Sequence, residues 1–153
     1  ACPALSGDIA QAAEAIGQPL HRDKTYACVE GPRLGTRAES HFLRGAANCD
    51  LVGMTNVPEA FLAREAQLAY CSLCLVTDYD CWMDDPEQHV SVDKFFEVYS
   101  STLAKAVSLL GQLLTEPLSE TPADIRNALQ RSVLTPRDSL NADQLKWLEV
   151  LQQ

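Results

Sequence analysis

Apolar residues recur at helical spacing in several stretches of the chain. The clearest stretch follows Ser91, where apolar residues every three or four positions form one continuous stripe that we expect to be core. Other helices are predicted over 5–16, 36–46 and 58–69, with two more beginning near 121 and 141. The stripe consists of Phe95 or Phe96, Tyr99, Leu103, Ala106 or Val107, Leu110, and Leu113 or Leu114.

Polar residues mark the starts of several of these helices. Thr36 with Glu39, and Asn141 with Gln144, have the spacing of a capping box, in which each side chain bonds the other residue's backbone amide. Thr121 precedes a proline and an acid in the same manner, so we expect it to cap a further helix.

Short apolar runs at 25–29, 50–54 and 70–76 alternate with these helices. The last run is apolar almost throughout, which is typical of a strand covered on both faces. Alternation of strands with helices predicts an α/β layered fold with a parallel sheet. Three strands make a small sheet whose edge needs covering, so we expect more of the sheet in residues beyond this sequence. The first residue is Ala1 rather than methionine, which favours a processed product or a segment of a longer chain.

The chain carries a formal net charge of −9, which argues against nucleic acid or an anionic membrane surface as a partner. It has no long apolar run of spanning length, and we expect a cytoplasmic protein.

The chain has six cysteines, a number that is compatible with disulfide bonds or a metal site. An extended backbone places Cys71 and Cys74 about 10 Å apart on opposite faces, too far for a disulfide. We therefore expect these two and Cys28 to be buried thiols. The histidines show no paired spacing with the cysteines, so no metal site is predicted.

Polar residues follow each predicted strand, and ligands of open parallel sheets bind beyond the carboxyl ends of strands. Asp78 and Asp80 emerge from the most apolar run, and crowding of two carboxylates favours a proton on one of them. An equally good interpretation of Asp78 and Asp80 is that they are turn residues or a helix cap with no chemical role. Thr55 is either a phosphate-binding hydroxyl or, as the pattern alone favours, a helix cap, and Arg33 fits an ion pair with Glu30 or Glu39.

Taken together, these segments resemble the methylthioadenosine phosphorylase family. Residues 31–40 read Gly-Pro-Arg-Leu-Gly-Thr-Arg-Ala-Glu-Ser and are similar to a family block. Residues 77–82, Thr-Asp-Tyr-Asp-Cys-Trp, match a highly specific one, and 53–66, 90–93 and 132–137 match others. The resemblance implies the C-terminal portion of a single nucleoside-phosphorylase-like domain over 1–137, three-layered with a central mixed or parallel sheet. Residues 138–153 are then a helical extension.

The resemblance also implies an activity, the phosphorolysis of S-methyl-5′-thioadenosine to adenine and 5-methylthioribose 1-phosphate. Phosphate is a co-substrate, and no cofactor is implied. Asp78 faces the five-membered-ring nitrogen of the purine as a general acid, and Asp80 the 6-amino group. Further substrate-binding positions are Leu34, Gly35, Met54, Thr77, Val92, Phe96 and Leu134, with Thr55 at the phosphate.

Some features depart from the family pattern. Leu34 stands where the family stacks a phenylalanine, Gly35 replaces a small hydroxyl residue, and residues 83–89 are one residue longer. The phosphate loop belongs to an N-terminal half that this sequence lacks, so the implied partners are that half and further copies in a homotrimer or dimer of trimers. Two alternatives stay open: a broader or 6-oxopurine nucleoside phosphorylase, and a catalytically inactive binding or assembly fragment.

Overall fold

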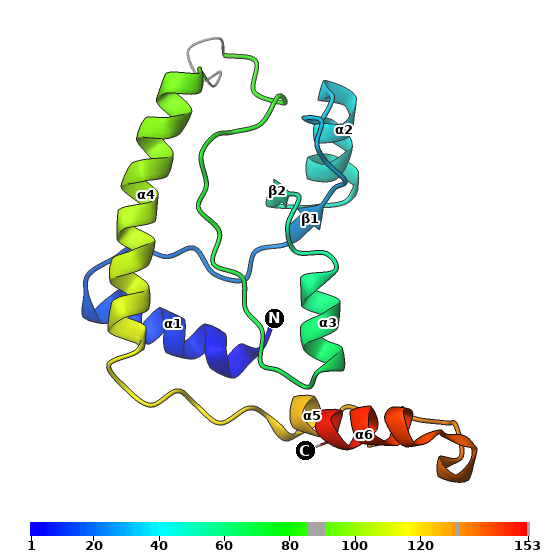
Figure 1. Ribbon diagram of the computed structural model, residues 1–153. Helices are drawn as coiled ribbons and strands as arrows, with labels where there is room; N and C mark the ends of the chain where they lie inside the picture. The colour runs from blue at the N-terminus through cyan, green and yellow to red at the C-terminus, as the bar shows by residue number, and fades with distance from the viewer. Residues whose placement is uncertain (86–90, 131, 153) are drawn as a thin grey trace.

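The computed structural model describes residues 1–85, 91–130 and 132–152, and its core forms where two helices cross. Helix α1 (Pro3–Ala15) packs against the lower part of α4 (Val92–Leu113), as Figure 1 shows. Ile9, Ala12, Ala13 and Leu109 are buried there. The two alanines allow close approach of the helices, so a small set of side chains closes this core.

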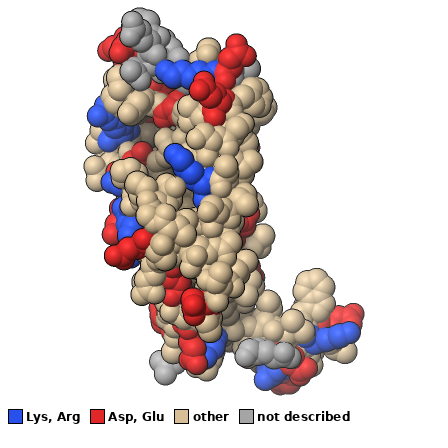
Figure 2. All heavy atoms as spheres, turned by 90° about the vertical axis from the view of Figure 1, so that its left-hand side faces the viewer, with Lys and Arg blue, Asp and Glu red and all other residues tan. Residues whose placement is uncertain are grey.

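The predicted stripe on α4 is only partly core. Of its residues, Leu113 packs against the core, whereas Tyr99, Leu103, Val107 and Leu110 are exposed; the buried residue of this helix is Leu109, which the prediction did not include. Two apolar stripes run side by side along this helix. The stripe that contains Leu109 packs against α1 and forms the core. Figure 2, which looks onto the α4 side of the molecule, shows a broad area free of charged side chains.

Two short strands pair in parallel, as predicted. Strand β1 (Tyr26–Cys28) lies beside β2 (Leu51–Gly53), with Tyr26 opposite Leu51 and Cys28 opposite Gly53. The connection between them consists of α2 (Arg37–His41) and a π-helical turn η1 (Phe42–Ala46). A helical crossover of this kind is what parallel pairing requires.

The prediction of a third strand over 70–76 is wrong for the described residues. The segment has no strand pairing and runs between α4 and the two strands (Figure 1). One backbone bond, from the Cys2 amide to the Tyr70 carbonyl at 2.6 Å, joins it to the N-terminus. A strand is defined by its ladder, and no described residue supplies one on either side of this segment.

The cysteine prediction is also partly wrong. All six cysteines are free thiols, but Cys28 and Cys71 are only half-buried and Cys74 is exposed, while Cys2 is buried. The whole 70–76 segment borders the hollow, and only Cys71 and Leu73 of this segment also pack against the core between α1 and α4.

Helix starts follow the sequence in two places and depart from it in two others. Both capping boxes, at Thr36 with Glu39 and at Asn141 with Gln144, are present. Thr55 caps nothing, because α3 (Glu59–Glu65) begins after Pro58 without a side-chain cap. The predicted cap at Thr121 is also absent, since Pro122 takes the cap position of the single-turn helix α5 (Ala123–Arg126).

The C-terminal elements are a 3-10 turn η3 (Arg137–Ser139) and α6 (Ala142–Leu151). Gln67, which follows α3, joins them to the body. Its amide nitrogen donates to the Leu151 carbonyl at 2.6 Å, and its oxygen accepts from the Leu129 amide at 2.9 Å. No helix among the described residues is both long and apolar enough to cross a membrane.

A carboxylate fixes the start of the strand pair. Asp50 Oδ2 accepts the Thr25 amide at 2.8 Å, and Lys24 Nζ lies 3.3 Å from Asp50 Oδ1. The Asp50 amide in turn donates to the Thr25 carbonyl at 2.9 Å. The hydrogen bond from Thr25 lowers the pKa of Asp50, and Lys24 acts in the same direction.

We expect Asp50→Ala to lower the midpoint of thermal unfolding at neutral pH, because the Thr25 amide loses its partner. A carboxyl with a lowered pKa stabilises the fold above its ordinary pKa and ceases to do so as the pH falls through the lowered value. The difference between wild type and variant should therefore close below about pH 4. Asp138→Ala, at an exposed position in η3, is the control; a difference that persists in acid would contradict this role.

Candidate functional site

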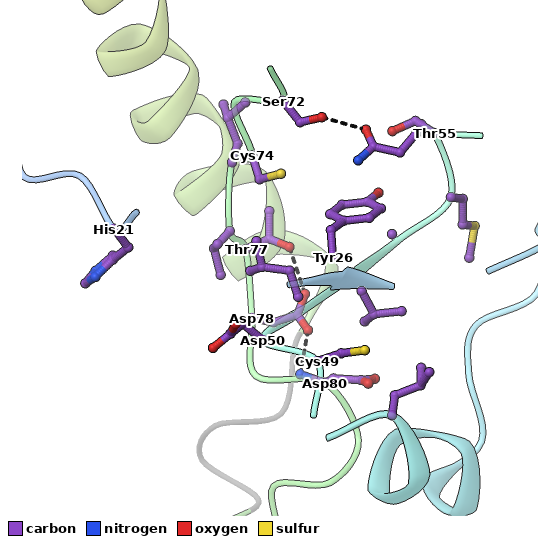
Figure 3. A pocket seen from close by; sticks show the side chains of 18 of the residues that line it. His21, Tyr26, Cys49, Asp50, Thr55, Ser72, Cys74, Thr77, Asp78 and Asp80 are labelled. Atoms are coloured by element: carbon purple, nitrogen blue, oxygen red, sulfur yellow. Dashed lines mark hydrogen bonds between the residues drawn. The ribbon is translucent and has the colours of Figure 1, made fainter. Parts of the chain in front are cut away.

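A large hollow opens between the 70–80 segment, the two strands and α4. Its volume is about 1490 Å³, and its lining includes Tyr26, Met54 and Thr55 from the strand side and Phe95 and Tyr99 from α4. Figure 3 shows Thr55 and Ser72 toward one end and Asp78 and Asp80 toward the other. Ligand pockets usually measure about 300–1,000 Å³, so this hollow has room for more than a small molecule.

Asp78 and Asp80 form one tight turn at an end of this hollow. Asp78 Oδ1 accepts the Asp80 amide at 2.9 Å, and Asp78 Oδ2 accepts the Thr77 hydroxyl at 2.8 Å. Asp80 has a φ of 59°, a left-handed conformation that aspartate tolerates better than most residues. The turn interpretation of the pair is thus confirmed. A carboxylate has about four lone-pair sites, so each Asp78 oxygen keeps one for a ligand.

A serine from a distant part of the chain reaches the second carboxylate. Ser40, at the end of α2, is only 2% exposed and donates its hydroxyl to Asp80 Oδ2 at 2.7 Å. The Cys81 amide donates to Asp80 Oδ1 at 2.8 Å. The neighbouring Cys81 thiol lies 3.7 Å from the Gly35 carbonyl oxygen, and burial together with the Asp80 charge raises the pKa of this thiol.

Ion pairs fix the helix that carries Ser40. The Arg33 guanidinium donates two hydrogen bonds to the Glu39 carboxylate, at 2.7 Å and 3.0 Å, and Arg37 forms an ion pair with Asp84. Hydrogen bonds from Arg33 and from the Thr36 amide lower the pKa of Glu39, and the same pairing raises the pKa of Arg33. Arg33 is therefore the structural ion pair that the sequence suggested, with Glu39 as its partner.

An aromatic contact holds the other side of the turn. The Arg44 guanidinium carbon lies 3.5 Å from the ring centroid of Trp82, and Tyr79 meets the same ring edge-on at 6.2 Å. Arg44 belongs to η1, so the helices after β1 contact the turn through both Ser40 and Arg44.

The loop after β2 lies beside a small polar network. Asn56 Oδ1 accepts the hydroxyls of Ser72 at 2.9 Å and Tyr70 at 3.3 Å, and the Tyr70 hydroxyl lies 3.0 Å from Glu59 Oε1. The Thr55 hydroxyl makes no hydrogen bond to any described residue and faces the hollow. Met54 lies against Gly31, where a Cβ would come 2.8 Å from the Met54 sulfur.

The structure brings together only some of the predicted site residues. Met54, Thr55, Thr77, Asp78 and Asp80 line the hollow. On α4 it is lined by Phe95 and Tyr99 rather than by the predicted Phe96, which is 59% exposed and lies outside the lining. Leu34 is 85% and Leu134 89% exposed, both outside the lining, and Gly35 borders the turn through Cys81. The side chain of Val92, and residues 86–90 of the longer loop, lie outside the described part of the chain.

Within the described residues, no three histidine, cysteine or acidic side chains come close enough together to hold a metal ion.

Comparison with known proteins identifies the family. Residues 1–110 match the model of the Phosphorylase superfamily. The chain belongs to this superfamily. It is 36% identical over 150 residues to an S-methyl-5′-thioadenosine phosphorylase of Geobacter sulfurreducens, covering 98% of this chain and 52% of the relative. The α/β fold with parallel pairing, expected from the resemblance, is confirmed by this membership.

Two solved structures are similar to this phosphorylase-family chain. One is a methylthioadenosine phosphorylase from an antarctic soil metagenomic library, with a TM-score of 0.85, 37% identity and coverage of 98% of this chain and 53% of that one. The other is a double mutant of adenosine/methylthioadenosine phosphorylase from Schistosoma mansoni in complex with adenine. It has a TM-score of 0.76 and 29% identity, and covers 87% of this chain and 54% of that one. The chain thus spans about half the length of its relatives.

Reasoning from the sequence missed two residues that hold the turn of this superfamily member. Ser40 and Arg44 lie in the predicted helix 36–46, and neither stands out in the pattern of that helix. Their signal was indirect: Ser40 is the last residue of the 31–40 block, and Arg44 is a basic residue near the helix end.

We expect Arg44→Ala to expose Trp82 and move its fluorescence emission to longer wavelength. The lost contact is worth about 0.5–1 kcal/mol at an exposed site. The measurement uses a Trp147→Phe background, because Trp147 is the second tryptophan and is 74% exposed. Arg64→Ala, on α3, is the control; an unchanged Trp82 spectrum in the Arg44 variant would show that the ring does not depend on the guanidinium.

Proposed function

We propose that this chain supplies the purine-binding part of an S-methyl-5′-thioadenosine phosphorylase. Phosphate attacks the anomeric carbon of the nucleoside, the glycosidic bond breaks, and adenine and 5-methylthioribose 1-phosphate are formed. The observation that carries the proposal is the paired carboxylates Asp78 and Asp80 on one turn at the hollow of a phosphorylase-superfamily chain.

Asp78 acts as the general acid. Cleavage of the glycosidic bond leaves negative charge on the purine, which a proton donated to the five-membered-ring nitrogen neutralises. Asp78 lies at the hollow, and each of its oxygens has a lone-pair site left beyond the bonds within the turn. Thr77, whose hydroxyl donates to Asp78, orients the carboxyl.

Asp80 contacts the group at position 6 of the purine and distinguishes an amino group from an oxo group. A carboxylate accepts a hydrogen bond from a 6-amino group and repels the oxygen of a 6-oxopurine. Both Asp80 oxygens already accept donors from the protein, and this fixes the carboxylate as an acceptor.

Sugar and phosphate occupy the other end of the hollow. Met54 lies under the ribose and Thr55 binds phosphate through its unengaged hydroxyl. Roles for Leu34, Gly35, Val92 and Phe96 in the base and methylthio pockets, and for Leu134 at a neighbouring subunit, stay predictions from the family resemblance.

Turnover requires more polypeptide than these 153 residues. The hollow exceeds the volume of a nucleoside site, no described residue pairs with the 70–76 segment as a strand, and the chain spans about half the length of its relatives. We infer that an N-terminal half, with the remaining phosphate ligands, fills this space, and that complete subunits assemble as a homotrimer or a dimer of trimers. The competing function is an inactive binding module, favoured by the engagement of both Asp78 oxygens within the turn.

We expect the complete protein to release adenine from methylthioadenosine only when phosphate is present. Asp78→Asn should lower kcat by about 10²–10⁴-fold, because the amide keeps an acceptor for the Asp80 backbone but cannot serve as the acid. Adenine release is followed by absorbance or chromatography. Release without phosphate, or an unimpaired Asp78→Asn variant, would rule out this mechanism; no release by the wild type would favour the inactive module.

Asp80→Asn should relax selectivity toward 6-oxopurine nucleosides. An asparagine amide can donate to the 6-oxo group, so kcat/KM for methylthioinosine should rise relative to methylthioadenosine. A gain of about 10–100-fold in the ratio corresponds to one repaired hydrogen bond. If the Asp80→Asn variant still does not turn over methylthioinosine, Asp80 does not contact the 6-position of the purine.

A further inference from the structure

We propose that Ser40 is a positioning residue for Asp80, and that its buried hydroxyl sets the preference for 6-aminopurines over 6-oxopurines. This inference rests on the proposed function, because it deepens the role of Asp80 there. The residue lies forty positions from its partner in sequence, borders the hollow, and acts on the purine through the Asp80 carboxylate.

Burial makes the contact directional. Ser40, at 2% exposure, is the only polar residue that is buried in the described part of the chain. A hydroxyl without water must find its partner within the protein, and this one donates to Asp80 Oδ2 at 2.7 Å. The bond therefore fixes the rotation of the carboxylate.

The second oxygen of Asp80 is fixed as well, since it accepts the Cys81 amide at 2.8 Å. A carboxylate that receives one donor on each oxygen is held as an acceptor with defined free lone pairs. Such a carboxylate binds a ligand group that donates a hydrogen bond and repels a ligand group that accepts one. A carboxylate free to rotate loses part of this discrimination, because it can turn away from a carbonyl oxygen.

The helix that carries Ser40 is held independently of this bond. The Thr36 and Glu39 capping box fixes its start, Arg33 pairs with Glu39, and the Ser40 amide donates to the Thr36 carbonyl at 2.9 Å. Arg37 also pairs with Asp84 beyond the turn. Loss of the Ser40 hydroxyl should therefore free the Asp80 carboxylate to rotate while α2 stays folded and in place.

The test compares variants of the complete phosphorylase that contains this chain. Ser40→Ala deletes the hydroxyl, and Ser40→Cys keeps a group at the γ position but replaces the hydroxyl with a larger, weak thiol donor. Ser119→Ala is the matched control, since its hydroxyl donates to the Asp8 carboxylate at 2.6 Å, in contact with α1 rather than the turn. For each, kcat/KM is measured for methylthioadenosine and for methylthioinosine.

Both Ser40 variants should lower the ratio of kcat/KM for the amino to the oxo substrate by roughly tenfold, the equivalent of one hydrogen bond to a charged group. Ser119→Ala should leave the ratio unchanged. A wild-type ratio in Ser40→Cys would overturn the proposal even if Ser40→Ala unfolds. Failure of the wild type to phosphorolyse methylthioadenosine would instead refute the proposed function, and with it the selectivity assigned to Ser40.

Discussion

The hydrogen bond between Ser40 and Asp80 joins the helix after β1 to the turn that follows the 70–76 segment. Among the described residues no strand pairs with the segment that leads into the turn, so the position of the turn depends on this bond and on the contacts of Arg44 with Trp82 and Arg37 with Asp84. Each contact spans about forty residues of sequence and acts from the same crossover connection. The local geometry of the paired carboxylates comes from bonds with Thr77 and Cys81, whereas α2 and η1 fix where the turn lies in the molecule.

The rest of the molecule leaves this site open. The α1 and α4 contact buries only a few side chains, and many large apolar residues elsewhere stay exposed, among them Val76, Leu114 and Trp147. Exposed apolar surface on this scale marks surfaces that meet other polypeptide. The proposed second half of the phosphorylase would meet this surface and reduce the hollow to the dimensions of a nucleoside and a phosphate.

Local sequence features predicted the parts of the fold that depend on neighbours in sequence. The capping boxes at Thr36 and Asn141 and the parallel pairing of 26–28 with 51–53 follow from spacing and chain direction. The strand at 70–76 and the phase of the α4 stripe were mispredicted. Both depend on what lies beside the segment, and an apolar pattern does not specify its neighbour.

The sequence by itself determined the superfamily and the two capping boxes, because a motif such as residues 77–82 and a cap act over a few residues. Only the tertiary structure decided that Ser40 and Arg44 hold this turn, that Phe95 rather than Phe96 faces the hollow, and that Thr55 is not a cap. These outcomes depend on packing between elements far apart in sequence. A hydroxyl near a carboxylate acquires its role only when folding excludes water from between them.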